Sequence, residues 1–155
     1  MTKTLQAAAA AVVLLFPVAV HAHVSITPQQ SASGATEKYT IRIPTEGKVA
    51  TTGADIEFPA GVIVETIQAP AGWKYEVRRQ DDRIVSMTIQ ADVKPGEFIE
   101  VAFVARNPRS GDRIVWTLRQ RFVDGTVTDW TTAPNGTVRP TAVTQLTAAA
   151  PAATR

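Results

Sequence analysis

The sequence predicts an all-β protein, folded as an antiparallel β-sandwich or a barrel-like Greek key. Three observations lead to this prediction. Short runs of β-branched and aromatic residues alternate with polar residues, and turn signals separate the runs about every eight to twelve residues. No segment keeps a helical periodicity beyond about one turn. The chain has 155 residues, which is enough for a leader and one domain with a hydrophobic core.

Five strands are expected in the first half of the chain, each rich in Val, Ile, Thr, Tyr or Phe. A Gly-containing turn at 31–34 separates the first strand from the second. Pro-Ala-Gly triplets at 59–61 and 70–72 end the third and the fourth. The five expected strands are 24–27, 38–43, 53–58, 62–68 and 73–78.

Four further strands are expected in the second half. The segment Gln80-Asp81-Asp82 is a candidate hairpin turn between the fifth strand and the sixth. Asp124-Gly125 is among the strongest hairpin signals and joins the last two. The four expected strands are 83–90, 97–106, 113–123 and 126–131.

Alternation along these strands predicts which residues form the core. In the seventh strand, for example, Ile99, Val101 and Phe103 share one face. The predicted core residues are Ile41, Ile43, Ile56, Phe58, Ile67, Val77, Ile89, Phe103, Trp116, Leu118 and Phe122.

The first 22 residues are typical of a secretory signal peptide. Lys3 supplies the basic start, 7–20 is an apolar run, and Val20 and Ala22 are small residues at the positions that a signal peptidase reads. We therefore expect cleavage after Ala22 and a periplasmic or secreted product that begins at His23. No later apolar stretch approaches the ~20 residues of a membrane span.

The other end of the chain changes in composition. From Thr141 onward the residues are mostly Ala, Thr and Pro, which predicts a disordered tail over 141–155. The folded domain is then expected to span 23–140.

Composition excludes several classes of function. The chain has no Cys, which rules out disulfides, Cys/His zinc sites, Cys nucleophiles and the thiolate of a blue-copper centre. Removal of the leader leaves Met87 as the only thioether, so a Met-rich Cu(I) site is excluded as well. The basic residues then nearly balance the acidic ones and form no run with interleaved aromatics, so no nucleic-acid partner is expected.

Conventional catalytic machinery is also missing from the sequence. No serine lies in a G-x-S-x-G motif, no glycine-rich phosphate loop is present, and pairs of carboxylates such as Asp81-Asp82 fall in turns. Of the two histidines, His21 leaves with the leader. We therefore expect that the protein is not an enzyme.

The remaining histidine, His23, carries the free α-amine of the expected product. Its amine nitrogen and its imidazole Nδ1 can close a six-membered chelate ring on one metal ion. Nitrogen donors of this kind suit Cu(II), which stands at the top of the divalent affinity order. Both groups can lose their protons to a metal near neutral pH. The alternative is that His23 is only the exposed first residue of a strand.

A carboxylate can join these two nitrogens if the first two strands form a hairpin over 29–36. Pro28 then lies opposite roughly Glu37, and His23 lies opposite roughly Arg42 or Ile43. In this register Glu46 is within reach of His23, while Glu37 is at the far end of the hairpin. The alternative interpretation of Glu46 is a solvated charge at the end of a strand.

Four separated segments resemble the YcnI-type copper-binding domain family, in the order in which that family has them. They are AHVSITP at 22–28, EKYTIRIPTE at 37–46, PAGWKY at 70–75 and DGTVTDWTTAP at 124–134. The resemblance spans about 23–140, which is nearly all of the expected folded part.

The resemblance implies a cupredoxin-like or fibronectin type III-like Greek key that binds Cu(II) through one N-terminal histidine. It implies that His23 gives its amine and imidazole, that a glutamate gives oxygen, and that Trp130 lies close to the ion. The glutamate is Glu46 or Glu37, and the hairpin register favours Glu46. On sequence pattern alone, Trp130 is a core residue.

Three functions are compared on this basis. The first is a copper carrier, buffer or chaperone that exchanges copper with other copper-trafficking proteins. The second is an oxidative enzyme such as a polysaccharide monooxygenase, whose histidine brace requires a second histidine that the processed chain lacks. The third is a metal-free β-sandwich module for adhesion or assembly, in which His23 has no role.

Overall fold

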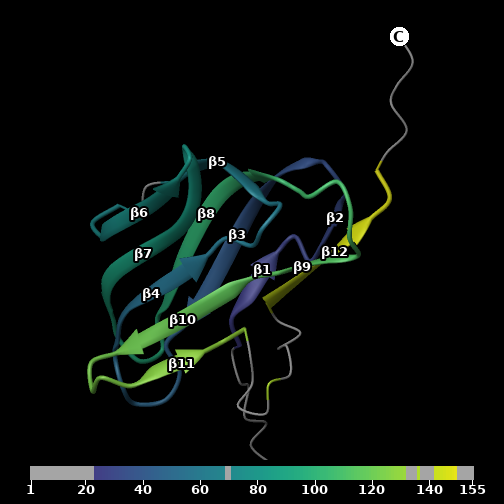
Figure 1. Cartoon of the computed structure of the whole chain (residues 1–155). Helices are drawn as coiled ribbons and strands as arrows, with labels where there is room; N and C mark the ends of the chain where they lie inside the picture. The colour runs from purple at the N-terminus through teal and green to yellow at the C-terminus, as the bar shows by residue number, and fades with distance from the viewer. Residues whose placement is uncertain (1–22, 69–70, 132–135, 137–141, 150–155) are drawn as a thin grey trace, which may run out of the picture.

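The computed structural model describes residues 23–68, 71–131, 136 and 142–149, and these residues form twelve β-strands (Figure 1). The expected leader over 1–22 lies outside the described residues. The strands are β1 (Ser25–Thr27), β2 (Gln30–Ala32), β3 (Thr36–Pro44), β4 (Thr51–Glu57), β5 (Ile63–Ile67), β6 (Lys74–Gln80), β7 (Arg83–Val93), β8 (Phe98–Arg106), β9 (Arg113–Val115), β10 (Thr117–Phe122), β11 (Val127–Asp129) and β12 (Val143–Thr147).

Most strands belong to one antiparallel sheet that folds into two facing layers joined along one edge (Figure 1). One layer has the order β1-β3-β8-β5, and the other has the order β6-β7-β4-β10-β11. The layers are continuous where Val64 of β5 pairs with Ile84 of β7, so the sheet curls around the core. The predicted all-β, antiparallel architecture is confirmed.

Beside the two layers of the sandwich lies a separate three-stranded sheet, which we call the third sheet (Figure 1). It contains the two strands that the sequence did not predict, β2 and β12. In it β12 pairs parallel with β2 and antiparallel with β9. The predicted disordered tail over 141–155 is therefore wrong for 143–147. Thr144 there is fully buried, and its hydroxyl accepts a hydrogen bond from Trp116 Nε1 at 3.0 Å. The prediction failed because it used the average composition of the whole tail, in which the short strand-forming run VTQLT at 143–147 is a minor part.

Two other element predictions need correction, and the rest hold. The expected turn at 31–34 is limited to 33–34, because 31 and 32 belong to β2. The expected strand 113–123 is broken at Trp116, so that β9 joins the third sheet and β10 joins the second layer. Both predicted hairpins are confirmed. β6 and β7 pair around Asp81 and Asp82, which have φ values of 47° and 62°. β10 and β11 pair around Asp124-Gly125, where the glycine has a φ of 84°.

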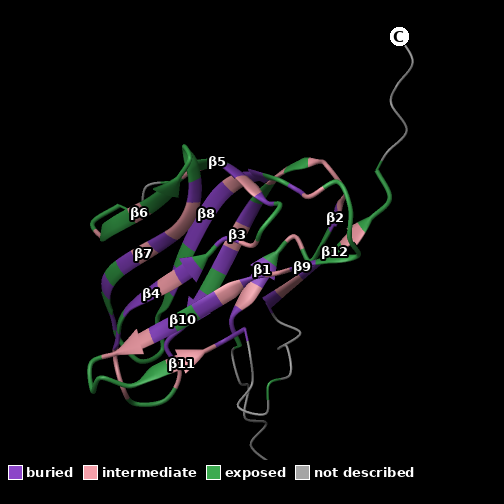
Figure 2. Ribbon diagram, in the orientation of Figure 1, coloured by how far each residue is buried: buried purple, intermediate pink, exposed green. Residues whose placement is uncertain are grey.

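The core lies between the two layers, and the burial pattern corrects part of the predicted core (Figure 2). Ile67, the last residue of β5, and Val77 are only partly buried. For Val77 the reason is that β6 is an edge strand exposed along most of its length. Phe122 is also half-buried, since it follows a register irregularity at the end of β10. The predicted core residues that are buried are Ile41, Ile43, Ile56, Phe58, Ile89, Phe103, Trp116 and Leu118.

A buried polar network closes the end of the sandwich where β3 begins. The Tyr39 ring lies 4.8 Å from that of Trp116, and its hydroxyl donates to Asn107 Oδ1 at 2.6 Å. Burial raises the pKa of the Tyr39 phenol, so this group stays protonated and can donate. Asn107 in turn donates to Ser31 Oγ at 2.9 Å. The network fastens β2 to β3 and to the end of β8.

Gly53 is the glycine that packing requires most strictly. A Cβ at this position would collide with the backbone carbonyl of Ile89 and lie 2.7 Å from Arg121 Nη2. We expect Gly53→Ala to lower the free energy of unfolding by roughly 2–4 kcal/mol, measured by urea denaturation. Gly111→Ala is the matched control, because Gly111 also has a positive φ of 107° but has open space around it. The control should lose about 1 kcal/mol, and equal losses would contradict the role of the collision.

Candidate metal centre

His23 lies at the beginning of the described chain, two residues before the first residue of β1. Val24 and Ile26 are buried, while His23 is exposed. β1 pairs antiparallel with β3, as predicted, with Ser25 opposite Arg42. Continuing this register places His23 beside Pro44, one or two residues further along β3 than expected. The loop between the two strands is not a simple turn, because β2 within it pairs with β12 in the third sheet.

Trp130 directly follows β11 and is 7% exposed, as a member of the core cluster. Its backbone N–H donates to Leu118 O at 2.9 Å, which continues the pairing of β10 with β11. Its ring also lies edge-on to the His23 ring, with 6.1 Å between centroids and 71° between planes. Trp130 is therefore both a core residue and a neighbour of His23.

Glu46 lies two residues beyond the end of β3, whose last residue, Pro44, is the one placed beside His23. The preceding residue, Thr45, is held by backbone hydrogen bonds to Glu97 O and from Gly96 N at 2.9 and 3.1 Å. The following residue, Gly47, has a φ of 77°, which lets the chain turn away. Glu46 Oε1 is buried and has no hydrogen-bond partner among the described groups. A buried carboxylate oxygen without a partner is costly, so this atom indicates a missing donor or cation.

Glu37, the other candidate, lies at the opposite end of β3. It pairs with Ala105 near the end of β8, and it accepts a hydrogen bond from Ser31 Oγ at 2.9 Å. Pro44 lies seven positions further along the chain, which is roughly 23 Å along an extended strand. A single ion beside His23 cannot contact a carboxylate at that distance. The geometry thus brings Glu46, and not Glu37, to the His23 end of the sandwich.

Gln120 of β10 joins the elements at this end, and the sequence reasoning missed it. It is fully buried, and its Oε1 accepts the Trp130 Nε1–H at 2.7 Å. Its Nε2 donates to Pro44 O at 3.0 Å and to Thr51 Oγ1 at 2.6 Å. One sequence signal could have found it: Gln120 follows Leu118 on the inward face of its strand, where a polar residue requires partners.

No other part of the described chain offers a comparable site. No three His, Cys, Asp or Glu side chains among the described residues are grouped to hold a metal ion.

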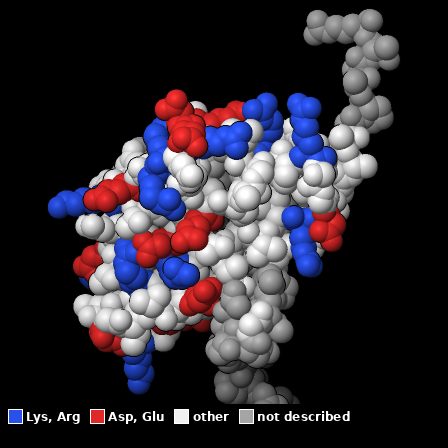
Figure 3. Space-filling view, in the orientation of Figure 1, with Lys and Arg blue, Asp and Glu red and all other residues white. Residues whose placement is uncertain are grey.

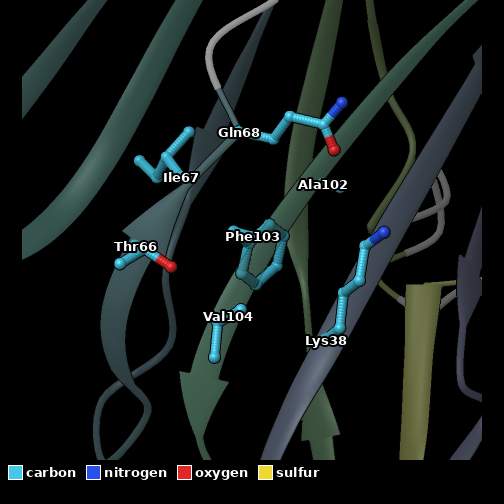
Figure 4. A pocket seen from close by; sticks show the side chains of 7 residues that line it. All are labelled: Lys38, Thr66, Ile67, Gln68, Ala102, Phe103 and Val104. Atoms are coloured by element: carbon cyan, nitrogen blue, oxygen red, sulfur yellow. The ribbon is translucent and has the colours of Figure 1, made fainter.

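A hollow of about 200 Å³ over β3, β5 and β8 is lined by residues that include Lys38, Gln68 and Phe103, and by no carboxylate or histidine (Figure 4). On the face shown in Figure 3, basic and acidic side chains are interspersed. The described residues contain no helix long and apolar enough to cross a membrane.

The residues at the His23 end fit one small cation if the α-amine is counted. Among the described residues, side chains supply an imidazole and a carboxylate here, which is too few for a buried metal site. Cleavage after Ala22 would turn the peptide nitrogen of His23 into a primary amine and add the third donor. Two nitrogens and one oxygen match the donor preference of Cu(II) better than that of Ca²⁺ or Mg²⁺, which take oxygen ligands. The unpartnered oxygen of Glu46 fits this interpretation.

Comparison with known proteins identifies relatives of the whole described domain. The family described as a domain of unknown function, DUF1775, matches residues 23–154 and so begins at His23. The copper-binding protein CutI of Bacillus subtilis (strain 168) is 34% identical over 121 residues, or 76% of this chain. This chain spans 59% of the length of that protein.

Solved structures support the fold. An uncharacterized protein from Nocardia farcinica, described as having an immunoglobulin-like fold, is 29% identical with a TM-score of 0.65. The match covers 83% of this chain and 99% of that one. A putative membrane anchored protein from Corynebacterium diphtheriae is 9% identical with a TM-score of 0.52, over 83% of this chain and 35% of that one. The sandwich predicted from the sequence is thus a known architecture of the immunoglobulin-like type.

Proposed function

This chain belongs to the DUF1775 family, the YcnI-type family that its motifs indicated, and from that premise we propose that it is an exported copper-binding protein. The similarity to a protein named as copper-binding supports the ion. The observation that carries the proposal is the buried, unpartnered Glu46 Oε1 at the same end of the sandwich as His23 and Trp130. Copper is the cargo that this protein holds, in a carrier, buffer or chaperone role.

Each residue has a distinct part in this proposal. His23 supplies two nitrogens of a chelate ring once the leader is removed, and these favour Cu(II) over harder cations. Glu46 supplies a negatively charged oxygen, which offsets the charge of the ion and gains the partner that it lacks. Trp130 packs against His23, limits access of water and can present its π-face to a cation. Export explains the free amine, since the signal peptidase creates it.

The two rival functions have less support. A histidine-brace oxidase requires a second imidazole, and the processed sequence has only His23. A metal-free adhesion or assembly module would leave the cost of the buried Glu46 oxygen unexplained. The proposed protein is therefore a binder of copper and not an enzyme, and it would exchange its ion with other copper-trafficking proteins.

The experiment that tests the proposal is a titration of the correctly processed protein with Cu(II). Mass spectrometry of exported protein first establishes that the chain begins at His23. Isothermal calorimetry and electron paramagnetic resonance should then show one equivalent of Cu(II) with nitrogen and oxygen ligands. Protein that begins at His23 and binds no copper would refute the proposal.

We expect the fold to form without copper. The core between the layers is large and apolar, and the proposed site is at one end of it. This contrasts with small zinc fingers, which are unfolded without their metal. Copper should add only its linkage free energy, about 2.7 kcal/mol at a hundredfold excess over Kd. Circular dichroism and thermal unfolding of metal-free protein check this, and a metal-free chain without β-structure would contradict it.

A further inference from the structure

We propose that Gln120 is a positioning residue for the copper site, which holds Trp130 and the end of β3 in place for the ion. This inference rests on the proposed function and adds a residue to it. Gln120 is 0% exposed and uses both ends of its amide: the oxygen accepts from Trp130, and the nitrogen donates to Pro44 O and Thr51 Oγ1. It thus connects the two segments that carry Trp130 and Glu46.

On the Trp130 side, the hydrogen bond at 2.7 Å fixes the orientation of the indole. The backbone of Trp130 is already held by Leu118 O, so the remaining freedom is rotation of the side chain. Gln120 Oε1 accepts the indole N–H, which orients the ring whose edge-on contact with His23 is 6.1 Å between centroids. Loss of this acceptor would leave a buried indole N–H without this partner and free the ring to turn.

On the β3 side, Gln120 reaches the segment that ends in Glu46. Its Nε2 donates to the carbonyl of Pro44, which is the last residue of β3 and the residue that the β1 register places beside His23. The same nitrogen donates to Thr51 Oγ1, which also accepts the hydroxyl of Thr45 at 2.8 Å. Thr45 directly precedes Glu46. A shift of Gln120 would therefore move the backbone on which the carboxylate stands.

A second buried hydrogen-bond network, far from the proposed site, serves as a comparison, because it should affect stability and not metal binding. The Tyr39–Asn107 network is also buried and also crosses between strands, but it lies at the end of the sandwich where β3 begins. Loss of a hydrogen bond in either network should lower stability. Only loss at Gln120 should alter the bound metal.

The test substitutes Gln120→Met, which keeps the length of the side chain and removes the amide oxygen and nitrogen that bond to Trp130, Pro44 and Thr51. Processed protein that begins at His23 is titrated with Cu(II), and its electron paramagnetic resonance spectrum is recorded. We expect the affinity for Cu(II) to fall about tenfold or more, as is typical when a residue that orients a metal ligand through a hydrogen bond is replaced. We also expect the copper hyperfine parameters to change. Tyr39→Phe, the matched control, should unfold more easily but keep the wild-type affinity and spectrum.

The outcomes separate the inference from the function on which it rests. If processed wild-type protein binds no Cu(II), the proposed function fails. If wild-type protein binds and Gln120→Met has the same affinity and spectrum, the positioning role alone is overturned. If Tyr39→Phe changes the spectrum as much as Gln120→Met, the effect is general destabilisation and the positioning role is again overturned.

A milder variant covers the case in which Gln120→Met does not fold. Thr51→Val keeps the shape of the side chain and removes the hydroxyl that accepts from Gln120 and Thr45. It leaves the bond of Gln120 to Trp130 intact. We expect a smaller loss of affinity with a changed spectrum, and an unchanged spectrum would count against a positioning role on the β3 side.

Discussion

Processed protein that begins at His23 should have a Cu(II) affinity about a hundredfold or more above that of the same protein with six residues placed before His23. The added residues turn the α-amine into a peptide nitrogen, and the chelate ring is lost. Two donors on one residue bind as a unit, because the second nitrogen is already next to the ion when the first has bound. A single imidazole lacks this advantage.

The length of the added segment matters to this experiment. An amine one or two residues before a histidine can chelate Cu(II) together with the intervening amide nitrogens, so a shorter extension would create a different site. A six-residue Gly-Ser segment avoids this. Calorimetry measures the affinity, and circular dichroism establishes that both proteins have the same fold.

The control retains the native start and changes His23→Ala. This variant keeps the amine and loses the imidazole, and it should lose affinity to a similar degree. If the extended protein instead binds one equivalent as tightly as the processed protein, the amine is not a ligand. The assignment of the metal to His23 would then be withdrawn.

The sequence predicts most of the fold because its local signals agree with one another. The Asp124-Gly125 turn and the alternation of Ile99, Val101 and Phe103 specify a hairpin and an inward face without any long-range information. β12 could not be predicted in this way. Its stability depends on pairing with β9 and with β2, which lies more than a hundred residues earlier, and on the hydrogen bond from Thr144 Oγ1 to Pro28 O. The amino-acid composition of a segment contains no information about such long-range contacts.

The candidate site shows the same division. The place of Glu46 at the His23 end could be predicted because pairing between two neighbouring strands fixes approximately which residues lie opposite each other. Trp130 has a core pattern, and only the family resemblance implied that it lies near the ion; the structure shows that its ring meets the ring of His23. Gln120 was missed because its partners, Pro44 and Trp130, come from different strands and meet only when the layers close.

The substitution Glu46→Gln should weaken Cu(II) binding by about 10- to 100-fold, while Glu37→Gln should leave it unchanged. Glutamine keeps the size of the side chain but removes the negative charge, so the attraction of a buried oxygen for the ion falls. Glu37 is the matched control, since it lies near the other end of β3, roughly 23 Å from Pro44, and already accepts a hydrogen bond from Ser31.

Affinity and the electron paramagnetic resonance spectrum distinguish these two variants. Glu46→Gln should change both in processed protein that begins at His23, with no loss of β-structure by circular dichroism. Glu37→Gln should change neither, although it weakens one hydrogen bond at the other end of β3. The reverse result would mean that the ion is bound at the start of β3, and the unpartnered oxygen of Glu46 would need another explanation. Equal, small effects of both variants would show that copper is held by His23 without a carboxylate from either end of the strand.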